Sequence, residues 1–395
     1  MTDTTNEPFA VQEPAFFSYG FRPFFLSAAL FASVAIPAWI LIVAGAGNVS
    51  FLYAPREWHV HEMLFGFLPA VIAGFLLTAM PNWTERPPIK GMPLMCLWSV
   101  WLAGRLVIAI HWLPPFLSAI IDGAFLVTLA IIAWREIAIG KAWDRAPIGV
   151  LISLYAGANL LFHSMALRSG ETDLPERMAL TVIILLLALI GGRVVPGFTL
   201  DFLSERGMVE HPPPFSRFDG MSILLAGIAA IAWTVQPETI ATGELLVMAG
   251  LVNLVRLLRW CGWVTWREPL VLILHLGYGW LAMALLIMGS AILGVGLRPT
   301  DAVHALTTGA VGTMTLAIMT RASLGHTGRP RHAGPMTVIT YLLVNLGALL
   351  RVFGPATDLP TPLVLSLSAM AWSGAYLLFA LVYGRYLLRP SMNED

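Results

Sequence analysis

Histidines next to apolar stretches are the side chains in this 395-residue chain whose type and spacing point to chemistry. The most polar such place is Trp58-His59-Val60-His61-Glu62, which precedes a long apolar run. Imidazole nitrogens bind haem iron, copper and zinc, and a nearby carboxylate can orient an imidazole ligand. We therefore expect His59 and His61 to be metal ligands, with Glu62 as a hydrogen-bond acceptor or a proton carrier.

Helix geometry limits how His59 and His61 can act together. Residues two apart on a regular helix point about 200° apart, so the two rings cannot face one point. They would serve two different groups, unless the helix begins irregularly. The competing interpretation is that Trp58, His59 and His61 form part of an amphipathic belt at a membrane surface.

Two further histidines, His163 and His304, lie near the ends of other apolar runs. His163 follows Asn159 by one helical turn, and His304 begins a run that contains Gly309 and Gly312. Two histidines from different helices can hold a haem inside a helical bundle. Each histidine alone could instead be a packing residue that bonds to a neighbouring helix.

The composition indicates that membrane helices position these residues. Charged residues make up 12% of the chain and hydrophobic residues 57%, and the mean hydropathy is +0.77. A soluble domain is about 25% charged. These values exclude a disordered chain, a nucleic-acid-binding protein and a disulfide-stabilised secreted fold. The two cysteines, Cys96 and Cys261, form no CxxC motif, which disfavours an attached c-type haem or an iron–sulfur cluster.

Twelve apolar stretches are long enough to cross a bilayer, which takes about 20 residues each. We therefore predict an all-α polytopic membrane protein with a single transmembrane domain over residues 1–395. The expected spans are 24–45, 58–80, 92–112, 114–134, 146–167, 178–197, 220–236, 240–258, 269–293, 302–320, 335–353 and 361–386.

The distribution of lysine and arginine predicts the orientation. With the N-terminus inside, seventeen of the 23 basic residues fall on the inner side and five on the outer side, and Arg105 lies within a span. This bias predicts that both termini are cytoplasmic. The same topology places His59, His61, His163 and His304, together with His111, near the outer face. A charge within a span must be paired, so we expect Arg105 to have a partner.

The inner half carries a second set of candidates. Arg193, in Gly191-Gly192-Arg193, could bind a carboxylate, a haem propionate or a lipid phosphate, although membrane anchoring explains it equally well. His275 and His326 are the next candidates for cofactor binding if the outer histidines do not hold one.

Several motifs resemble those of the NnrS family, and the resemblance covers nearly the whole chain. They are Phe21-Arg22-Pro23-Phe24-Phe25, the segment from Trp58 to Gly66, Gly191-Gly192-Arg193, and the segment from His304 to Arg329. The family is described as haem- and copper-containing bacterial inner-membrane proteins with about twelve spans, associated with denitrification and with tolerance of nitric oxide. The resemblance implies a b-type haem and nitric oxide as the small molecule, and it leaves copper open as a second metal.

The leading hypothesis is therefore a multi-pass protein of the bacterial inner membrane that binds nitric oxide and reduces it, as a nitric oxide reductase-like enzyme. Electrons would come from membrane quinol or from a donor protein. Two alternatives stay open. The first is a twelve-span secondary transporter of a small anion. The second is a haem-based nitric oxide sensor or a haem-handling protein without turnover.

Overall fold

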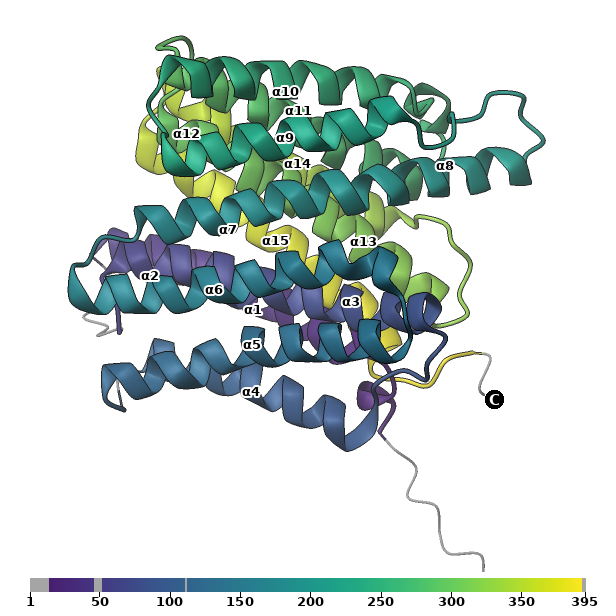
Figure 1. The fold of residues 1–395 in the computed structure, drawn as a ribbon, viewed down its shortest axis with the longest axis horizontal. Helices are drawn as coiled ribbons and strands as arrows, with labels where there is room; N and C mark the ends of the chain where they lie inside the picture. The colour runs from purple at the N-terminus through teal and green to yellow at the C-terminus, as the bar shows by residue number, and fades with distance from the viewer. Residues whose placement is uncertain (1–13, 46–51, 111, 393–395) are drawn as a thin grey trace, which may run out of the picture.

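The structure is a computed structural model that describes residues 14–45, 52–110 and 112–392. Within these residues all regular secondary structure is helical (Figure 1). His111 lies outside the described residues. The α-helices are α1 (Phe21–Val43), α2 (Pro55–His61), α3 (Leu68–Thr84), α4 (Gly91–Ala109), α5 (Pro115–Ile139), α6 (Ala146–Arg168), α7 (Asp173–Leu186), α8 (Gly192–Glu205), α9 (Arg217–Val235), α10 (Ile240–Leu258), α11 (Pro269–Ile292), α12 (Pro299–His304), α13 (Gly312–Gly325), α14 (Pro335–Phe353) and α15 (Thr361–Leu387).

These helices form twelve segments that are long and apolar enough to cross a membrane, as the sequence predicts, and the chain is a multi-pass membrane protein. Proline begins α2, α5, α11, α12 and α14, where its missing amide hydrogen costs no helical hydrogen bond. Three spans are longer than expected: Pro55–Thr84, Asp173–Glu205 and Pro299–Gly325. Their polar ends lower the local hydropathy, so a hydropathy pattern ends before the helix does.

Each of the three long spans contains a π-helical segment. These segments are η2 (Glu62–Phe67) between α2 and α3, η4 (Leu187–Gly191) between α7 and α8, and η6 (Ala305–Val311) between α12 and α13. The spans that contain η2 and η6 are the most buried, with 78% and 72% of their apolar windows inside the protein. They therefore form the centre of the bundle, away from lipid.

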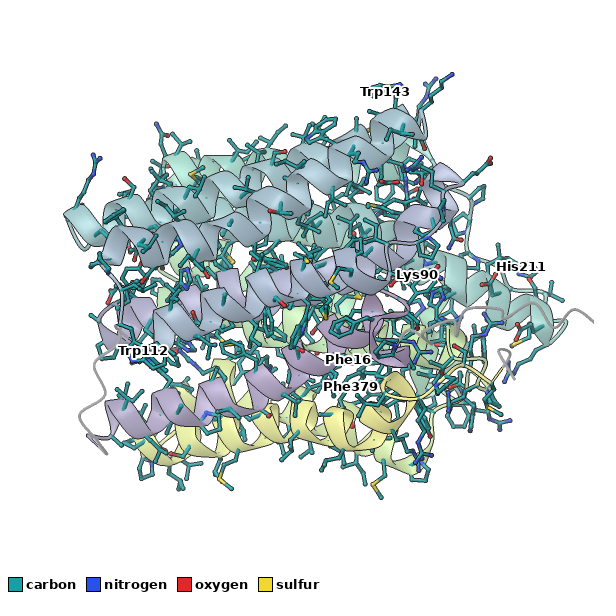
Figure 2. All side chains as sticks on the ribbon, turned by 90° about the horizontal axis from the view of Figure 1, so that it is seen from below. Phe16, Lys90, Trp112, Trp143, His211 and Phe379 are labelled. Atoms are coloured by element: carbon teal, nitrogen blue, oxygen red, sulfur yellow. The ribbon has the colours of Figure 1, made fainter. Side chains whose placement is uncertain are left out.

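The first described helix, α1, begins beside the end of the last one, α15, at one end of the bundle. The guanidinium of Arg22 donates to the carbonyl oxygens of Leu387 at 3.2 Å and Arg389 at 2.5 Å. We call this the terminal end, and the opposite one the histidine end. Figure 2 shows Trp112 at the histidine end and Trp143 at the terminal end. Tryptophan at both ends fits the interfacial belts of a membrane protein; the cytoplasmic placement of the termini stays a prediction.

The helical hairpin of α4 and α5 lies at one edge of the bundle, and α9 and α10 lie at the opposite edge (Figure 1). The arginines inside α10 and α14 are paired. Arg256 of α10 is fully buried and donates to Asp219 at 3.0 Å, and Arg351 of α14 donates to Asp301 at 2.6 Å. Pairing removes most of the cost of placing a charge in a low-dielectric interior.

Candidate metal centre and the neighbouring cavity

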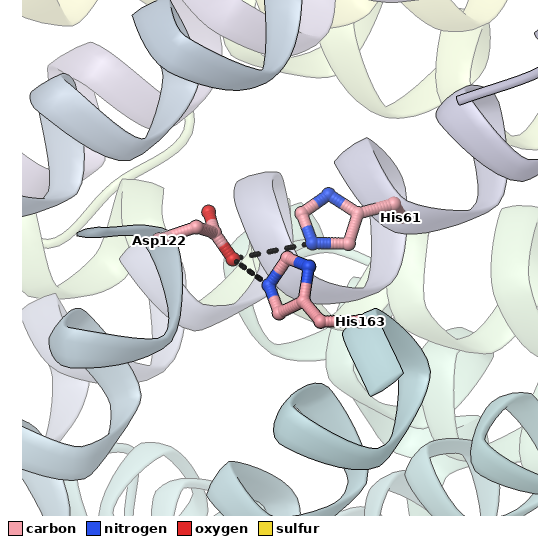
Figure 3. Close-up of side chains that lie close together, drawn as sticks. All are labelled: His61, Asp122 and His163. Carbon is pink, nitrogen blue, oxygen red and sulfur yellow. Dashed lines mark hydrogen bonds and ion pairs between the residues drawn. The ribbon is translucent and has the colours of Figure 1, made fainter. Parts of the chain in front are cut away.

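Three side chains from three spans meet near the histidine end. His61 of α2, Asp122 of α5 and His163 of α6 point toward one another (Figure 3). One donor atom from each lies within 4.8 Å of the other two. The Asp122 Oδ2 atom is 3.2 Å from His61 Nε2 and 2.9 Å from His163 Nε2. All three residues are buried, with exposed fractions of 0%, 2% and 3%.

The lengths and directions of the helices explain why these residues meet at one depth. Asp122 is the eighth residue of α5, about 10 Å from the helix start at a rise of about 1.5 Å per residue. His163 lies five residues before the end of α6, roughly 8 Å from that end. Because α5 and α6 run in opposite directions and pack together, the two positions face each other.

Each imidazole is held by a second group on its other ring nitrogen. His61 Nδ1 lies 3.0 Å from Glu62 Oε1, and His163 Nδ1 lies 2.5 Å from the Tyr53 hydroxyl oxygen. Metal-binding histidines in proteins are oriented in this way, by an acceptor at the nitrogen that does not bind the metal. Glu62 thus occupies the orienting position that the sequence predicts for it.

The carboxylate of Asp122 is held as tightly as the two imidazoles. Arg105 donates to Asp122 Oδ1 and also to Glu62 Oε2, the latter at 2.9 Å. The amide of Asn159 donates to Asp122 Oδ2 at 3.1 Å. Arg105 therefore has the partners that its mid-span position requires. The arrangement leaves Asp122 Oδ2 as the oxygen that faces the two histidines.

Formal charge shows that the cluster favours a cation. Two carboxyl groups, Glu62 and Asp122, bond to the single guanidinium of Arg105, so by formal charge the cluster has one more acidic group than basic group. A metal ion, or a proton on one imidazole, would balance the extra acidic group. Burial and the Asp122 and Glu62 carboxylates raise the pKa of Tyr53, so its hydroxyl stays neutral.

One buried atom carries the fit to a metal most directly. When His61 Nδ1–H donates to Glu62, the lone pair of His61 Nε2 faces the Asp122 oxygen, and two acceptors oppose each other. This nitrogen has no hydrogen-bond partner among the described residues. Two imidazoles and a carboxylate form a donor set suited to copper, zinc or iron. The residues therefore fit a metal ion at this point.

The π-helical segment η2, directly after His61, fixes the backbone beside the cluster. A π-helical turn changes the helical hydrogen-bonding pattern, and such turns often occur at functional sites. Side chains bond to its carbonyl oxygens: the Tyr155 hydroxyl donates to Leu64, and Trp101 Nε1 donates to Gly66 at 2.9 Å. A side chain at Gly66 would collide with Arg105, so glycine is required there.

The other two predicted ligands, His59 and His304, line a separate cavity of about 170 Å³ at the same end. The His59 ring stacks on Trp39 with centroids 4.3 Å apart. His304 Nδ1–H donates to the Thr300 carbonyl oxygen at 2.6 Å, which leaves Nε2 as a free ligand atom. His59 thus serves a different place from His61, as the 200° relation on a helix requires.

The lining of this cavity carries groups of the kinds that hold a haem, although its volume of about 170 Å³ lies below the roughly 300–1,000 Å³ of typical ligand pockets, so the cavity would have to widen around a haem. The walls are mostly apolar and include the indole rings of Trp39 and Trp372, with Arg351 as the cationic side chain on the lining. A haem needs axial imidazoles, apolar walls and a cation for its propionates. The donor set of His59 and His304 supplies the first of these. The four outer histidines therefore divide into two pairs rather than forming one site.

The remaining predicted residues lie at the terminal end, far along the bundle from both sites. His275 Nε2 bonds to the Thr199 hydroxyl at 2.8 Å. The His326 ring contacts the rings of Tyr19 and Phe21. Arg193 is exposed and lines a different cavity. The structure does not bring these three residues to the histidine clusters.

Two important side chains, Asp122 and Tyr53, are missing from the residues selected by sequence. A signal for Asp122 was present, because a carboxylate in the middle of the 114–134 apolar stretch is costly unless it has a function. Tyr53 lies in the connection before α2, where the sequence shows nothing that would link it to His163.

The chain matches the sequence model of a protein family. This model, described as NnrS protein, matches residues 15–391, which is nearly the whole chain. A comparison with curated proteins finds no match. The family match includes every residue of the two histidine pairs, together with Asp122, Glu62 and Arg105. This chain therefore belongs to the NnrS family.

Proposed function

We propose that this protein is a haem protein of the bacterial inner membrane, with a second metal, that binds nitric oxide and reduces it to nitrous oxide. Its membership of the NnrS family fits a haem-protein role related to nitric oxide. The observation that carries the proposal is the buried set of His61, Asp122 and His163, whose facing atoms lie within 4.8 Å of one another. Two imidazoles and a carboxylate are a donor set that suits copper, zinc or iron, and copper and iron can supply redox chemistry.

The two pairs of histidines would have separate roles. In the first pair His304, whose Nε2 is free, would bind haem iron, and His59 would line the space left for nitric oxide, with Arg351 near a propionate. In the second pair His61 and His163, with Asp122, would bind copper. Bound haem would supply the iron atom to which nitric oxide coordinates. The cavity of His59 and His304 is separated from the copper ligands by only one or two residues of α2, because His59 and His61 are two positions apart.

Reduction of two nitric oxide molecules to one nitrous oxide and one water takes two electrons and two protons. The electrons would come from membrane quinol or from a donor protein. With copper bound, His61 Nε2, His163 Nε2 and Asp122 Oδ2 would face the metal. Two groups beside them would remain to hold protons: the Tyr53 hydroxyl, 2.5 Å from His163 Nδ1, and the Glu62 carboxylate, 3.0 Å from His61 Nδ1. Of these two, Glu62 would hold the proton that is used in the reaction.

The apolar walls suit the proposed substrate. Nitric oxide is small and neutral, so it crosses hydrocarbon and needs no polar channel. Val60, Met63 and Val311 line the cavity of His59 and His304, and the adjacent cavity toward the terminal end has a purely apolar lining. Water is thereby kept away from the ligand atoms while the gas can reach them.

Optical spectra and metal analysis of the purified protein test this proposal. We expect a Soret band that shifts with nitric oxide, and nitrous oxide formation when a quinol analogue is the reductant. The variant His304→Ala should lose the Soret band, while His275→Ala, a histidine change at the other end of the bundle, should keep it. Absence of haem from protein made in haem-replete cells would refute the proposal.

The same experiment separates the proposal from its alternatives. Nitric oxide binding without nitrous oxide formation would replace turnover by sensing or haem handling. Anion uptake into vesicles by protein that lacks haem would instead establish a secondary transporter. The buried metal-ligand set favours the haem–copper proposal over transport, since a transporter of a small anion has no need for it.

A further inference from the structure

A second cavity, of about 500 Å³, opens at the terminal end of the bundle, away from both histidine pairs. Its walls come from α1, α3, α8 and α13, and from the connection that follows α13. Aromatic and aliphatic side chains form the deeper part, among them Phe75, Val194 and Phe198. Arg321, Arg329 and Arg331 also line it, and its described lining includes no carboxylate.

Arg321 is the unusual member of this lining. It belongs to α13, its exposed fraction is 8%, and it lines the cavity. Its guanidinium lies 3.8 Å from the centroid of the Phe198 ring, and the described residues form no hydrogen bond or ion pair with it. A buried arginine without an anionic partner is costly, and such residues mark ligand sites in membrane proteins.

The other two arginines differ from Arg321 because each has a contact of its own. Arg329 donates to the Thr327 carbonyl oxygen at 3.2 Å and lies over the Tyr386 ring. Arg331 is exposed and lies 3.6 Å from the Glu205 carboxylate. Both add positive potential at the cavity, and neither can neutralise the charge of Arg321.

We infer that this cavity binds a phosphate group, with Arg321 as its principal ligand. The planar guanidinium forms paired hydrogen bonds with phosphate oxygens. Three arginines around one cavity give it a positive potential that suits a phosphate group, which carries one negative charge in a phospholipid and up to two in inorganic phosphate or a monoester. The group could belong to a soluble phosphate compound or to the headgroup of an anionic phospholipid, and both offer Arg321 the same oxygens.

Thermal unfolding of the full-length protein in detergent tests this inference. One arm adds inorganic phosphate against sodium chloride of equal ionic strength. The other adds phosphatidylglycerol against phosphatidylcholine to delipidated protein. We expect the phosphate compound to raise the Tm of the wild type and the Arg321→Gln change to weaken binding by about tenfold or more. Arg217→Gln is the matched control, because Arg217 is an exposed arginine at the start of α9 and does not line this cavity, and it should bind within twofold of the wild type.

The outcomes separate the two sources and can overturn the inference. A Tm shift with inorganic phosphate assigns a soluble compound, and a shift only with phosphatidylglycerol assigns a lipid headgroup. If neither raises the wild-type Tm, the cavity binds no phosphate group, whatever the variants do. Equal shifts for wild type and folded Arg321→Gln, checked by size-exclusion chromatography, would remove Arg321 from the site.

Discussion

Replacement of Asp122 by asparagine changes the one residue that contacts both imidazoles and Arg105. The amide keeps the shape but removes the charge. Loss of one partner from a buried ion pair costs about 3–5 kcal/mol, and the lower end applies because Arg105 keeps its bond to Glu62. Removal of an outer-shell partner alone weakens metal binding by about 10–100-fold, so loss of a direct ligand should weaken it by at least about 100-fold.

The assay is the metal content of purified protein after dialysis, measured together with the free energy of unfolding. Asp219→Asn is the matched control, because Asp219 is also buried and bonds to Arg256 at 3.0 Å, in a different part of the bundle. Both variants should lose about 3 kcal/mol of stability, but only Asp122→Asn should lose the metal. Full metal content in Asp122→Asn, with the expected loss of stability, would refute Asp122 as a ligand.

Three further predictions concern single side chains. Tyr53→Phe removes the hydroxyl that holds His163 Nδ1, so copper affinity measured by competition with a chelator should fall about 10–100-fold while haem content stays unchanged. Thr308→Val, which changes the lining beside His304 but no ligand, should alter the nitric oxide dissociation rate in stopped-flow measurements and leave the Soret band in place; loss of the band would contradict the proposed ligands. Burial lowers the pKa of His326 below its usual value of 6.5, so the unfolded state binds a proton more readily. The free energy of unfolding should therefore fall as the pH drops below about 6.5, and it should fall less steeply in His326→Gln. The measurement is the Tm of both proteins between pH 5 and pH 8, and an equal pH dependence would contradict the prediction.

The number of spans was predictable, because hydropathy reports the local cost of leaving water. That His59 and His61 serve different sites was also predictable, because two residues two positions apart on a helix point in nearly opposite directions. Which helices are neighbours depends on packing over the whole bundle. For that reason, the sequence did not show that His61 would pair with His163, or His59 with His304.

Asp122, the carboxylate at the centre of the cluster, was not predicted from the sequence. It is a single acidic residue inside an apolar stretch, and no histidine lies near it in sequence to mark it as a metal ligand. The need for a partner at Arg105 was a second pointer to the same place, because a buried cation requires a buried anion nearby. Joining the two observations would have predicted an Arg105–Asp122 pair on consecutive spans, but not the histidines that meet there.

That pair has a consequence for how the protein enters the membrane. Insertion of a helix with a central aspartate or arginine is unfavourable by about 2.5–3.5 kcal/mol for each charge. Arg105 and Asp122 lie on α4 and α5, consecutive helices that form one hairpin, and their ion pair can form within that hairpin. The two helices should therefore enter the bilayer together, as a unit assembled during synthesis. A variant that lacks either charge would be found first as a smaller amount of protein in the membrane, before any assay of its chemistry.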